Sequence, residues 1–256
     1  MNLFVKKSGQ GDIPLVLLHG WGTSAAVFEP LIPLLASKFE IFSVDLPGFG
    51  QSPWIPNLTP EKMAALVVAQ INKPAVYLGW SMGSLVALCA AHDFAEHTLA
   101  YINVTGTPAF SQYFWPFGIS VKGLTQFAKQ IRLAPEQVRK DFIDLHFRHS
   151  AIDATLKTNV VTELNATPSD PEALIVTTDW LGSIDLRPMW QNLRVPTLSL
   201  LAEKDILLPV AAAHELKTLN ASTQLEVIPK ASHMPFLDMP SVFVTLLTQF
   251  VENHVS

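Results

Sequence analysis

The sequence predicts an α/β protein in which a mostly parallel central sheet is flanked by helices and carries an inserted helical cap. Three observations lead to this fold class. Short apolar runs recur along the chain, helix-like stretches separate most of them, and this alternation stops once and then resumes. Parallel strands require long crossovers, which are usually helices. With 49% hydrophobic residues among 256, the chain can bury one sizeable core.

Five apolar runs have the length of buried strands, at residues 15–18, 41–44, 75–79, 99–104 and 197–202. Continuous apolar runs are typical of strands that are covered on both faces, as in parallel sheets. Thr59 and Pro60 form a helix start, and that helix is expected to run toward Ile71. Pro240 begins the last predicted helix, toward His254. Right-handed crossovers then place helices on both faces of the sheet.

The alternation breaks between about residues 110 and 187, where strand-like runs vanish and helical stretches rich in aromatic residues follow. We interpret residues 110–187 as an inserted helical cap, on a core formed by residues 1–109 and 188–256. A separate C-terminal domain fits less well, because the last segment resumes the strand and helix alternation and would complete the same sheet.

Charge and cysteine content exclude several classes of function. The formal net charge of −5 provides no general basic field for nucleic acid. No apolar run is long enough to span a membrane, and the first residues, with Lys6 and Lys7, do not form a secretory signal. Cys89 is the single cysteine, which excludes an internal disulfide and a cysteine metal cluster. We therefore expect a cytoplasmic protein that binds neither nucleic acid nor membrane.

A candidate nucleophile lies in the segment Gly79, Trp80, Ser81, Met82, Gly83, which matches the pattern G-x-S-x-G. Ordinary turns also produce this pattern, but here a predicted strand precedes it and a helical stretch follows it. A serine on such a sharp turn has a strained backbone, and the flanking glycines leave room for the neighbouring chain. The N-terminus of the following helix favours negative charge on an attacked carbonyl. Ser81 is therefore the predicted nucleophile.

Serine needs a base and the base needs a carboxylate. Of the eight histidines, His233 lies in a loop after the strand-like residues 225–228 and before the last helix. The carboxyl ends of strands are where catalytic groups of open α/β sheets collect. Asp205, after the strand at 197–202, gives the order Ser, Asp, His that is typical of this kind of nucleophile. Glu203 is the nearest alternative, because predicted strand ends are uncertain by about two residues.

The segment His19, Gly20, Trp21, Gly22 follows another predicted strand. Its glycines let the backbone turn toward the nucleophile, so the backbone N–H groups of Trp21 and Met82 are the expected oxyanion donors. His19 is expected to brace this loop. His146 and His149 are three residues apart in the cap, but with no cysteine nearby they are a weak metal pair, and we expect no metal site.

These residues resemble the α/β-hydrolase superfamily, through residues 19–22, through Asp-Leu-Pro-Gly-Phe-Gly-Gln-Ser at residues 45–52, and through Ser81, Asp205 and His233. More narrowly, His-Gly-Trp-Gly, Asp-Leu-Pro-Gly-Phe-Gly and Gly-Trp-Ser-Met-Gly are similar to the pimeloyl-[acyl-carrier protein] methyl ester esterase family of biotin synthesis. That family usually has leucine where this chain has Met82, a difference that conserves volume and keeps the N–H donor.

The resemblance implies the α/β-hydrolase fold and the cleavage of a methyl ester from a pimeloyl chain on acyl carrier protein, with release of methanol. It implies no metal and no organic cofactor. It also implies five residues at the reacting end of the substrate: Trp21, Ser81, Met82, Phe142 and His233. Docking of acyl carrier protein on the cap would use basic residues, whose candidates are Lys122, Lys129, Arg132, Arg139, Lys140, Arg148 and Lys157.

Aromatic residues of the cap are candidates for an apolar tunnel that holds an acyl chain, while others would attach the cap to the core. They are Phe110, Tyr113, Phe114, Trp115, Phe117, Phe127, Phe142 and Phe147. The triad alone leaves alternatives open: a broad short-chain carboxylesterase, a thioesterase or a carbon–carbon bond hydrolase could use the same residues. A ligand receptor that keeps the fold is a further alternative. A haloalkane dehalogenase is disfavoured, since it would need an aspartate in place of Ser81.

Overall fold

A computed structural model describes residues 2–148, 150, 152–167 and 169–255. Within these residues, seven strands form one sheet in the order β1-β3-β2-β4-β5-β6-β7. The strands are β1 (Val5–Ser8), β2 (Ile13–Leu18), β3 (Phe39–Val44), β4 (Ala75–Trp80), β5 (Thr98–Val104), β6 (Thr197–Ala202) and β7 (Gln224–Ile228). β1 pairs with β3 in antiparallel orientation, and the other neighbours pair in parallel. The predicted mostly parallel sheet is confirmed.

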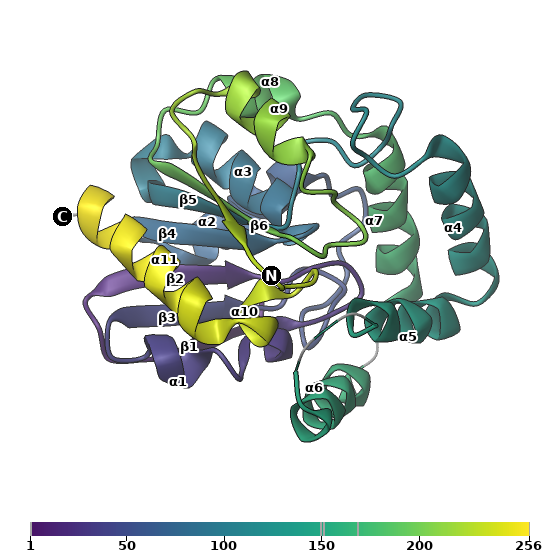
Figure 1. Cartoon of the computed structure of the whole chain (residues 1–256). Coiled ribbons are helices and arrows are strands. Elements are labelled where there is room, and N and C mark those ends of the chain that lie inside the picture. Colours follow the sequence, from purple (N-terminus) through teal and green to yellow (C-terminus); the bar gives the residue numbers. More distant parts are fainter. Residues whose placement is uncertain (1, 149, 151, 168, 256) are drawn as a thin grey trace.

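Helices cover both faces of the sheet, because successive side chains of a strand point to opposite sides. One face packs on α2 (Pro60–Ile71), α3 (Gly83–Asp93), α8 (Arg187–Gln191) and α9 (Ala212–Leu219). The other packs on α1 (Ile32–Leu35), α10 (Pro235–Asp238) and α11 (Pro240–His254). Val16 and Leu18 of β2 belong to the first apolar cluster, and Leu15 and Leu17 to the second. Figure 1 shows α11 in front of the sheet and α3 behind it.

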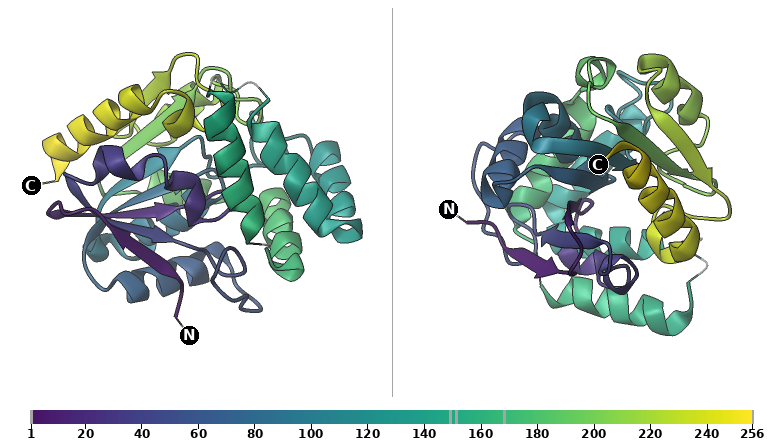
Figure 2. Two further views of the ribbon diagram at one scale, coloured as in Figure 1. Left: turned by 90° about the horizontal axis from the view of Figure 1, so that it is seen from below. Right: turned by 90° about the vertical axis from the view of Figure 1, so that its left-hand side faces the viewer.

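Between β5 and α8, the described residues form four helices, which confirms the predicted helical insert. They are α4 (Val121–Leu133), α5 (Pro135–His146), α6 (Ala154–Ala166) and α7 (Pro171–Ser183). Side chains of Ser120, Asp153 and Asp170 cap the starts of α4, α6 and α7 by accepting backbone N–H groups. The four helices gather at one side of the sheet, where β4 and β6 end (Figures 1 and 2). No helix of the described residues is long and apolar enough to cross a membrane.

The edge strand β1 is absent from the predicted strands. Lys6 and Lys7 are exposed and interrupt the apolar pattern by which the other strands are found. Charged side chains on an edge strand discourage pairing with another chain. Two lysines in β1 are therefore consistent with its place at the edge of the sheet.

Candidate active site

Ser81 occupies the turn between β4 and α3. Its φ of 53° lies in the left-handed region, which costs a residue other than glycine about 1–3 kcal/mol. Its N–H donates to the carbonyl of Val104 at 2.9 Å, which ties the turn to β5. A Cβ at Gly79 would lie 2.4 Å from the carbonyl oxygen of Gly83, and one at Gly83 would lie 2.3 Å from that of Leu18. Both glycines are thus needed for the sharp turn at Ser81.

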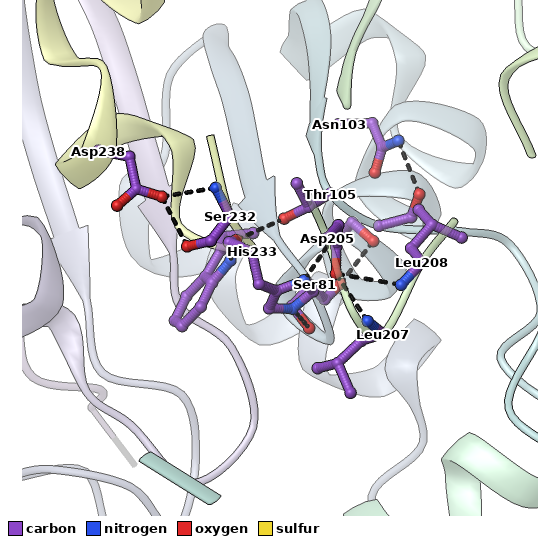
Figure 3. Close-up of polar contacts among 12 residues, drawn as sticks. Ser81, Asn103, Thr105, Asp205, Leu207, Leu208, Ser232, His233 and Asp238 are labelled. Atoms are coloured by element: carbon purple, nitrogen blue, oxygen red, sulfur yellow. Dashed lines mark hydrogen bonds and ion pairs between the residues drawn. The ribbon is translucent and has the colours of Figure 1, made fainter. Parts of the chain in front are cut away.

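Ser81, His233 and Asp205 form a hydrogen-bonded chain (Figure 3). Nε2 of His233 lies 2.9 Å from Oγ of Ser81, and Nδ1 lies 2.7 Å from Oδ2 of Asp205. Because a carboxylate only accepts hydrogen bonds, we assign the ring hydrogen to Nδ1, and Nε2 then presents its lone pair to the serine hydroxyl. The side chains of His233 and Asp205 are each 1% exposed. This geometry allows the His233 ring to accept the proton of Ser81 at a position shielded from bulk water.

Backbone groups hold Asp205 in place. Its Oδ1 accepts from the N–H groups of Leu207 at 2.8 Å and Leu208 at 3.1 Å, which leaves Oδ2 for His233. The alternative acid, Glu203, is exposed, and its carboxylate accepts from the N–H of Lys230 at 2.7 Å. The structure therefore brings Asp205 to His233 and not Glu203.

The loop after β2 lies against the nucleophile. A Cβ at Gly20 would be 2.9 Å from the Trp80 ring and 3.3 Å from Cβ of Ser81. Trp21 follows Gly20 in this loop, and Met82 follows Ser81 directly before α3. Met82 is thus the direct neighbour of the nucleophile, and Trp21 lies one residue beyond Gly20; their role as oxyanion donors stays a prediction.

His19 braces this loop, as expected. Its Nε2 accepts from the N–H of Leu46 at 3.0 Å, so we place the ring hydrogen on Nδ1, which then donates to the carbonyl of Gly20 at 2.8 Å. Burial lowers the pKa of His19, and the nearby charge of Asp45 opposes this shift in part. A neutral His19 therefore links the loop after β2 to the loop after β3.

Helix α5 of the cap reaches the triad through Phe142 and His146. The Phe142 ring packs against Trp21, with 5.1 Å between ring centroids, and against His146 at 4.6 Å. The His146 ring lies 5.0 Å from the His233 ring and 5.4 Å from Trp80. Phe142 thus lies one ring away from His233, through His146, and its contact with the substrate stays a prediction. His146 is an unexpected neighbour, since the sequence marks it only as half of a weak metal pair.

His146 is a neutral ring inside the site. Burial, and then the charge of the nearby His233, hold the pKa of His146 well below its usual value. Its Nδ1 is buried and has no hydrogen-bond partner among the described residues. The spacing of four from Phe142 places both on one helix face, which is the sequence signal for this contact. His149, the other half of the pair, lies outside the described residues.

The described residues contain no group of three or more His, Cys, Asp or Glu side chains that could hold a metal ion. They do contain an apolar cavity of about 630 Å³, lined mainly by α4 and α5 and reaching Leu207. A second cavity, of about 330 Å³, is lined by Asp205 and shares Ile119 and Leu207 with the first. The two cavities therefore adjoin at Ile119 and Leu207, between the cap helices and the loop that carries Asp205.

The cap aromatics divide between these cavities and the packing of the cap. The ones that line a cavity are Phe117, Phe127 and Phe142. Three others are buried in the apolar clusters: Phe110, Trp115 and Phe147. Phe114 is partly buried against the first cluster, whereas Tyr113 is 77% exposed.

Arg139 is not a surface cation, so its predicted place among the docking residues is wrong. It is fully buried, and its Nη1 donates to the carbonyls of Gly22 at 3.1 Å and Leu164 at 3.2 Å. Its Nη2 pairs with Glu136 at 2.7 Å. These bonds tie α5 to the loop after β2 and to α6. The other candidates are exposed or partly exposed: Lys122, Lys129, Arg132, Lys140, Arg148 and Lys157.

The pattern of the family described as alpha/beta hydrolase fold matches residues 13–240. The chain belongs to the α/β-hydrolase family. This α/β-hydrolase is 30% identical over 253 residues to the pimeloyl-[acyl-carrier protein] methyl ester esterase of Legionella pneumophila, covering 98% of this chain and 100% of that protein. It is 36% identical over 256 residues to the protein of the same name from Pectobacterium carotovorum, covering 98% of each.

Solved structures agree on the fold of this α/β-hydrolase. An esterase from Exiguobacterium antarcticum superposes with a TM-score of 0.87 at 24% identity, over 98% of this chain and 95% of that chain. The enol-lactonase from Burkholderia xenovorans gives 0.81 at 19% identity, over 98% and 96%. The resemblance drawn from the sequence is thus confirmed, and the chain is an α/β-hydrolase of the esterase family.

Proposed function

We propose that this α/β-hydrolase is a serine carboxylesterase that cleaves the methyl ester of a pimeloyl chain carried on acyl carrier protein. The observation that carries the proposal is the hydrogen-bonded chain from Asp205 through His233 to Ser81, with contacts of 2.7 and 2.9 Å. The name of the curated relatives supplies the substrate. The apolar cavity of about 630 Å³ lined mainly by α4 and α5 has room for an acyl chain and supports this substrate.

Acylation starts when Oγ of Ser81 attacks the ester carbonyl and its proton passes to Nε2 of His233. Asp205 holds the ring in orientation and stabilises the imidazolium. The N–H groups of Trp21 and Met82 donate to the oxyanion. The tetrahedral intermediate then expels the methoxy group, which takes the proton from His233 and leaves as methanol. Ser81 remains acylated.

Deacylation repeats these steps with water. His233 takes a proton from the water, whose oxygen attacks the acyl carbonyl, and the oxyanion forms at the same two N–H groups. Ser81 then leaves with the proton from His233, and the free carboxylate is released. These steps use no metal and no organic cofactor.

The proposal gives the two parts of the chain different tasks. Residues 1–109 and 188–256 form the core that carries the chemistry, and residues 110–187 form the cap that selects the substrate. Exposed cap cations, Lys122, Lys129 and Lys140 among them, are the candidates for contact with the acidic carrier protein. The reaction takes place in the cytoplasm.

The test compares kcat/KM of the purified protein for the pimeloyl-[acyl-carrier protein] methyl ester with a generic short ester, a short thioester and a carbon–carbon bond substrate. We expect a preference for the pimeloyl ester of at least about tenfold. Ser81→Ala should reduce turnover by about 10⁴-fold or more. Equal rates on the short ester would replace the narrow assignment by a broad carboxylesterase. No turnover of any substrate would favour a ligand receptor instead.

A further inference from the structure

The loop that carries His233 is fixed by the core on one side (Figure 3). The carbonyl of His233 accepts from Nε1 of Trp80 at 2.8 Å and from Oγ of Thr105 at 2.9 Å. Trp80 ends β4, and Thr105 follows β5. One donor therefore belongs to strand β4 of the sheet, and the other belongs to the loop directly after β5.

Asp238, the last residue of α10, fixes the other side of the loop. Its Oδ2 accepts from the N–H and from the hydroxyl of Ser232, each at 2.6 Å. Its Oδ1 accepts from the hydroxyl of Ser150, which lies between α5 and α6 of the cap. A single half-buried carboxylate thus joins the cap to the residue next to His233.

The same end of α5 also contacts the base itself. His146, the last residue of α5, packs its ring 5.0 Å from that of His233, and Ser150 follows four residues later. Hydrogen bonds to a carboxylate are shorter and stronger than neutral ones and depend on direction. Movement of this end of the cap must therefore break the bond between Ser150 and Asp238 or displace Ser232.

We propose that Asp238 is a positioning residue that couples the cap to His233, so that the base is aligned with Ser81 only while the hydroxyl of Ser150 is bonded to Asp238. The inference rests on the proposed roles of Ser81 and His233. It adds a residue that touches neither the substrate nor the reacting atoms. Substrates that move the cap would then change the rate at the triad as well as their own affinity.

The experiment measures kcat and KM for p-nitrophenyl acetate, whose acetyl group is too short to fill the cap cavity. Ser150→Ala should lower kcat about five- to tenfold with little change in KM, and Asp238→Ala about ten- to thirtyfold. The double variant should be no slower than Asp238→Ala, because both substitutions break one coupled unit. Ser150→Thr keeps a hydroxyl and should restore most of kcat. Ser183→Ala, at an exposed serine of α7, is the matched control and should leave kcat unchanged.

Losses that multiply in the double variant, or a change in KM alone for Ser150→Ala, would overturn the coupling. The role of the triad is tested separately, by whether Ser81→Ala abolishes the turnover that the unsubstituted protein shows. The proposed function can therefore fail while the coupling holds, and the coupling can fail while the proposed function holds. Hydrogen–deuterium exchange needs no substrate and gives a second measurement. In folded Ser150→Ala, as judged by its melting temperature, the amides of residues 229–237 should exchange several-fold faster, and unchanged exchange would contradict the proposal.

Discussion

Core and cap contact the site of Ser81 in different ways. In the core, hydrogen bonds of 2.7 to 3.1 Å fix Asp205 and His233. In the cap, Phe142 and His146 contact the site through their rings. Hydrogen bonds lose strength when distance or angle changes slightly, whereas ring packing tolerates several arrangements. The core therefore fixes Asp205 and His233 directly, whereas the rings of the cap can adapt to the substrate. The cap acts on the base through the hydrogen bond from Ser150 to Asp238.

The largest loss of activity should come from a substitution in the core, at Asp205. Asp205→Asn keeps an oxygen for the N–H groups of Leu207 and Leu208 but turns an amide toward His233, which favours the wrong tautomer. We expect kcat to fall about 10³- to 10⁴-fold for short and long esters alike, with the melting temperature largely kept. Glu203→Gln is the matched control and should be nearly silent. A larger loss in Glu203→Gln would show that the acid is misassigned.

Arg139 is a cap residue that behaves like a core residue, so it tests the comparison directly. Arg139→Ala leaves the buried carbonyls of Gly22 and Leu164 without their donor, and we expect the free energy of unfolding to fall by about 2–4 kcal/mol. Lys140→Ala, at the exposed neighbouring position, should change it by less than about 0.5 kcal/mol. Chemical denaturation measures both. Equal effects would mean that Arg139 is solvated in solution.

Phe142 should affect substrates according to their length. Phe142→Ala removes part of the cavity wall, and we expect KM for a long acyl ester to rise about tenfold while kcat for p-nitrophenyl acetate stays within about twofold. Tyr113→Ala truncates an exposed aromatic residue of the cap and serves as the control. If both ester lengths suffered equally, Phe142 would belong with the triad and not with substrate choice.

The smallest expected effect is on how the stability of the fold depends on pH. Because the pKa of His146 is lowered in the folded protein, the unfolded chain binds more protons below about pH 6.5. The folded state then loses stability as the pH falls through this range, by up to about 1.4 kcal/mol per pH unit. His146→Phe keeps a ring between Phe142 and Trp80 but removes the titrating group.

Between pH 7 and pH 5, the melting temperature of the unsubstituted protein should therefore fall about 3–6 °C further than that of His146→Phe. His214→Gln, at an exposed histidine, should leave the pH dependence unchanged. Parallel curves for His146→Phe and the unsubstituted protein would mean that His146 is hydrated, with the cap open.

Local patterns were sufficient for the inner strands of the core, which are continuous apolar runs, and for the site residues that follow their ends, but they missed the charged edge strand β1. The cap was harder. A charge on a helix is normally solvated, so Arg139 reads as a surface residue until the packing of α5 is known. Arg139, Ile143 and His146 are the buried residues of α5, spaced three and four apart. The sequence alone does not indicate that this face of α5, which carries a cation and a histidine, packs against the rest of the protein. The contacts of the folded chain show it.

The residues at the end of β5 determine whether the cap of such a protein can be replaced without disturbing the triad. Val104 accepts from the N–H of Ser81 at 2.9 Å, and the hydroxyl of the next residue, Thr105, donates to the carbonyl of His233 at 2.9 Å. Nucleophile and base are thus anchored on two consecutive residues that precede the cap in the chain. A cap from another protein could be grafted between β5 and β6 with the spacing of Ser81 and His233 preserved. For the base, such a chimera has to reproduce a hydroxyl at the place of Ser150, which donates to Asp238.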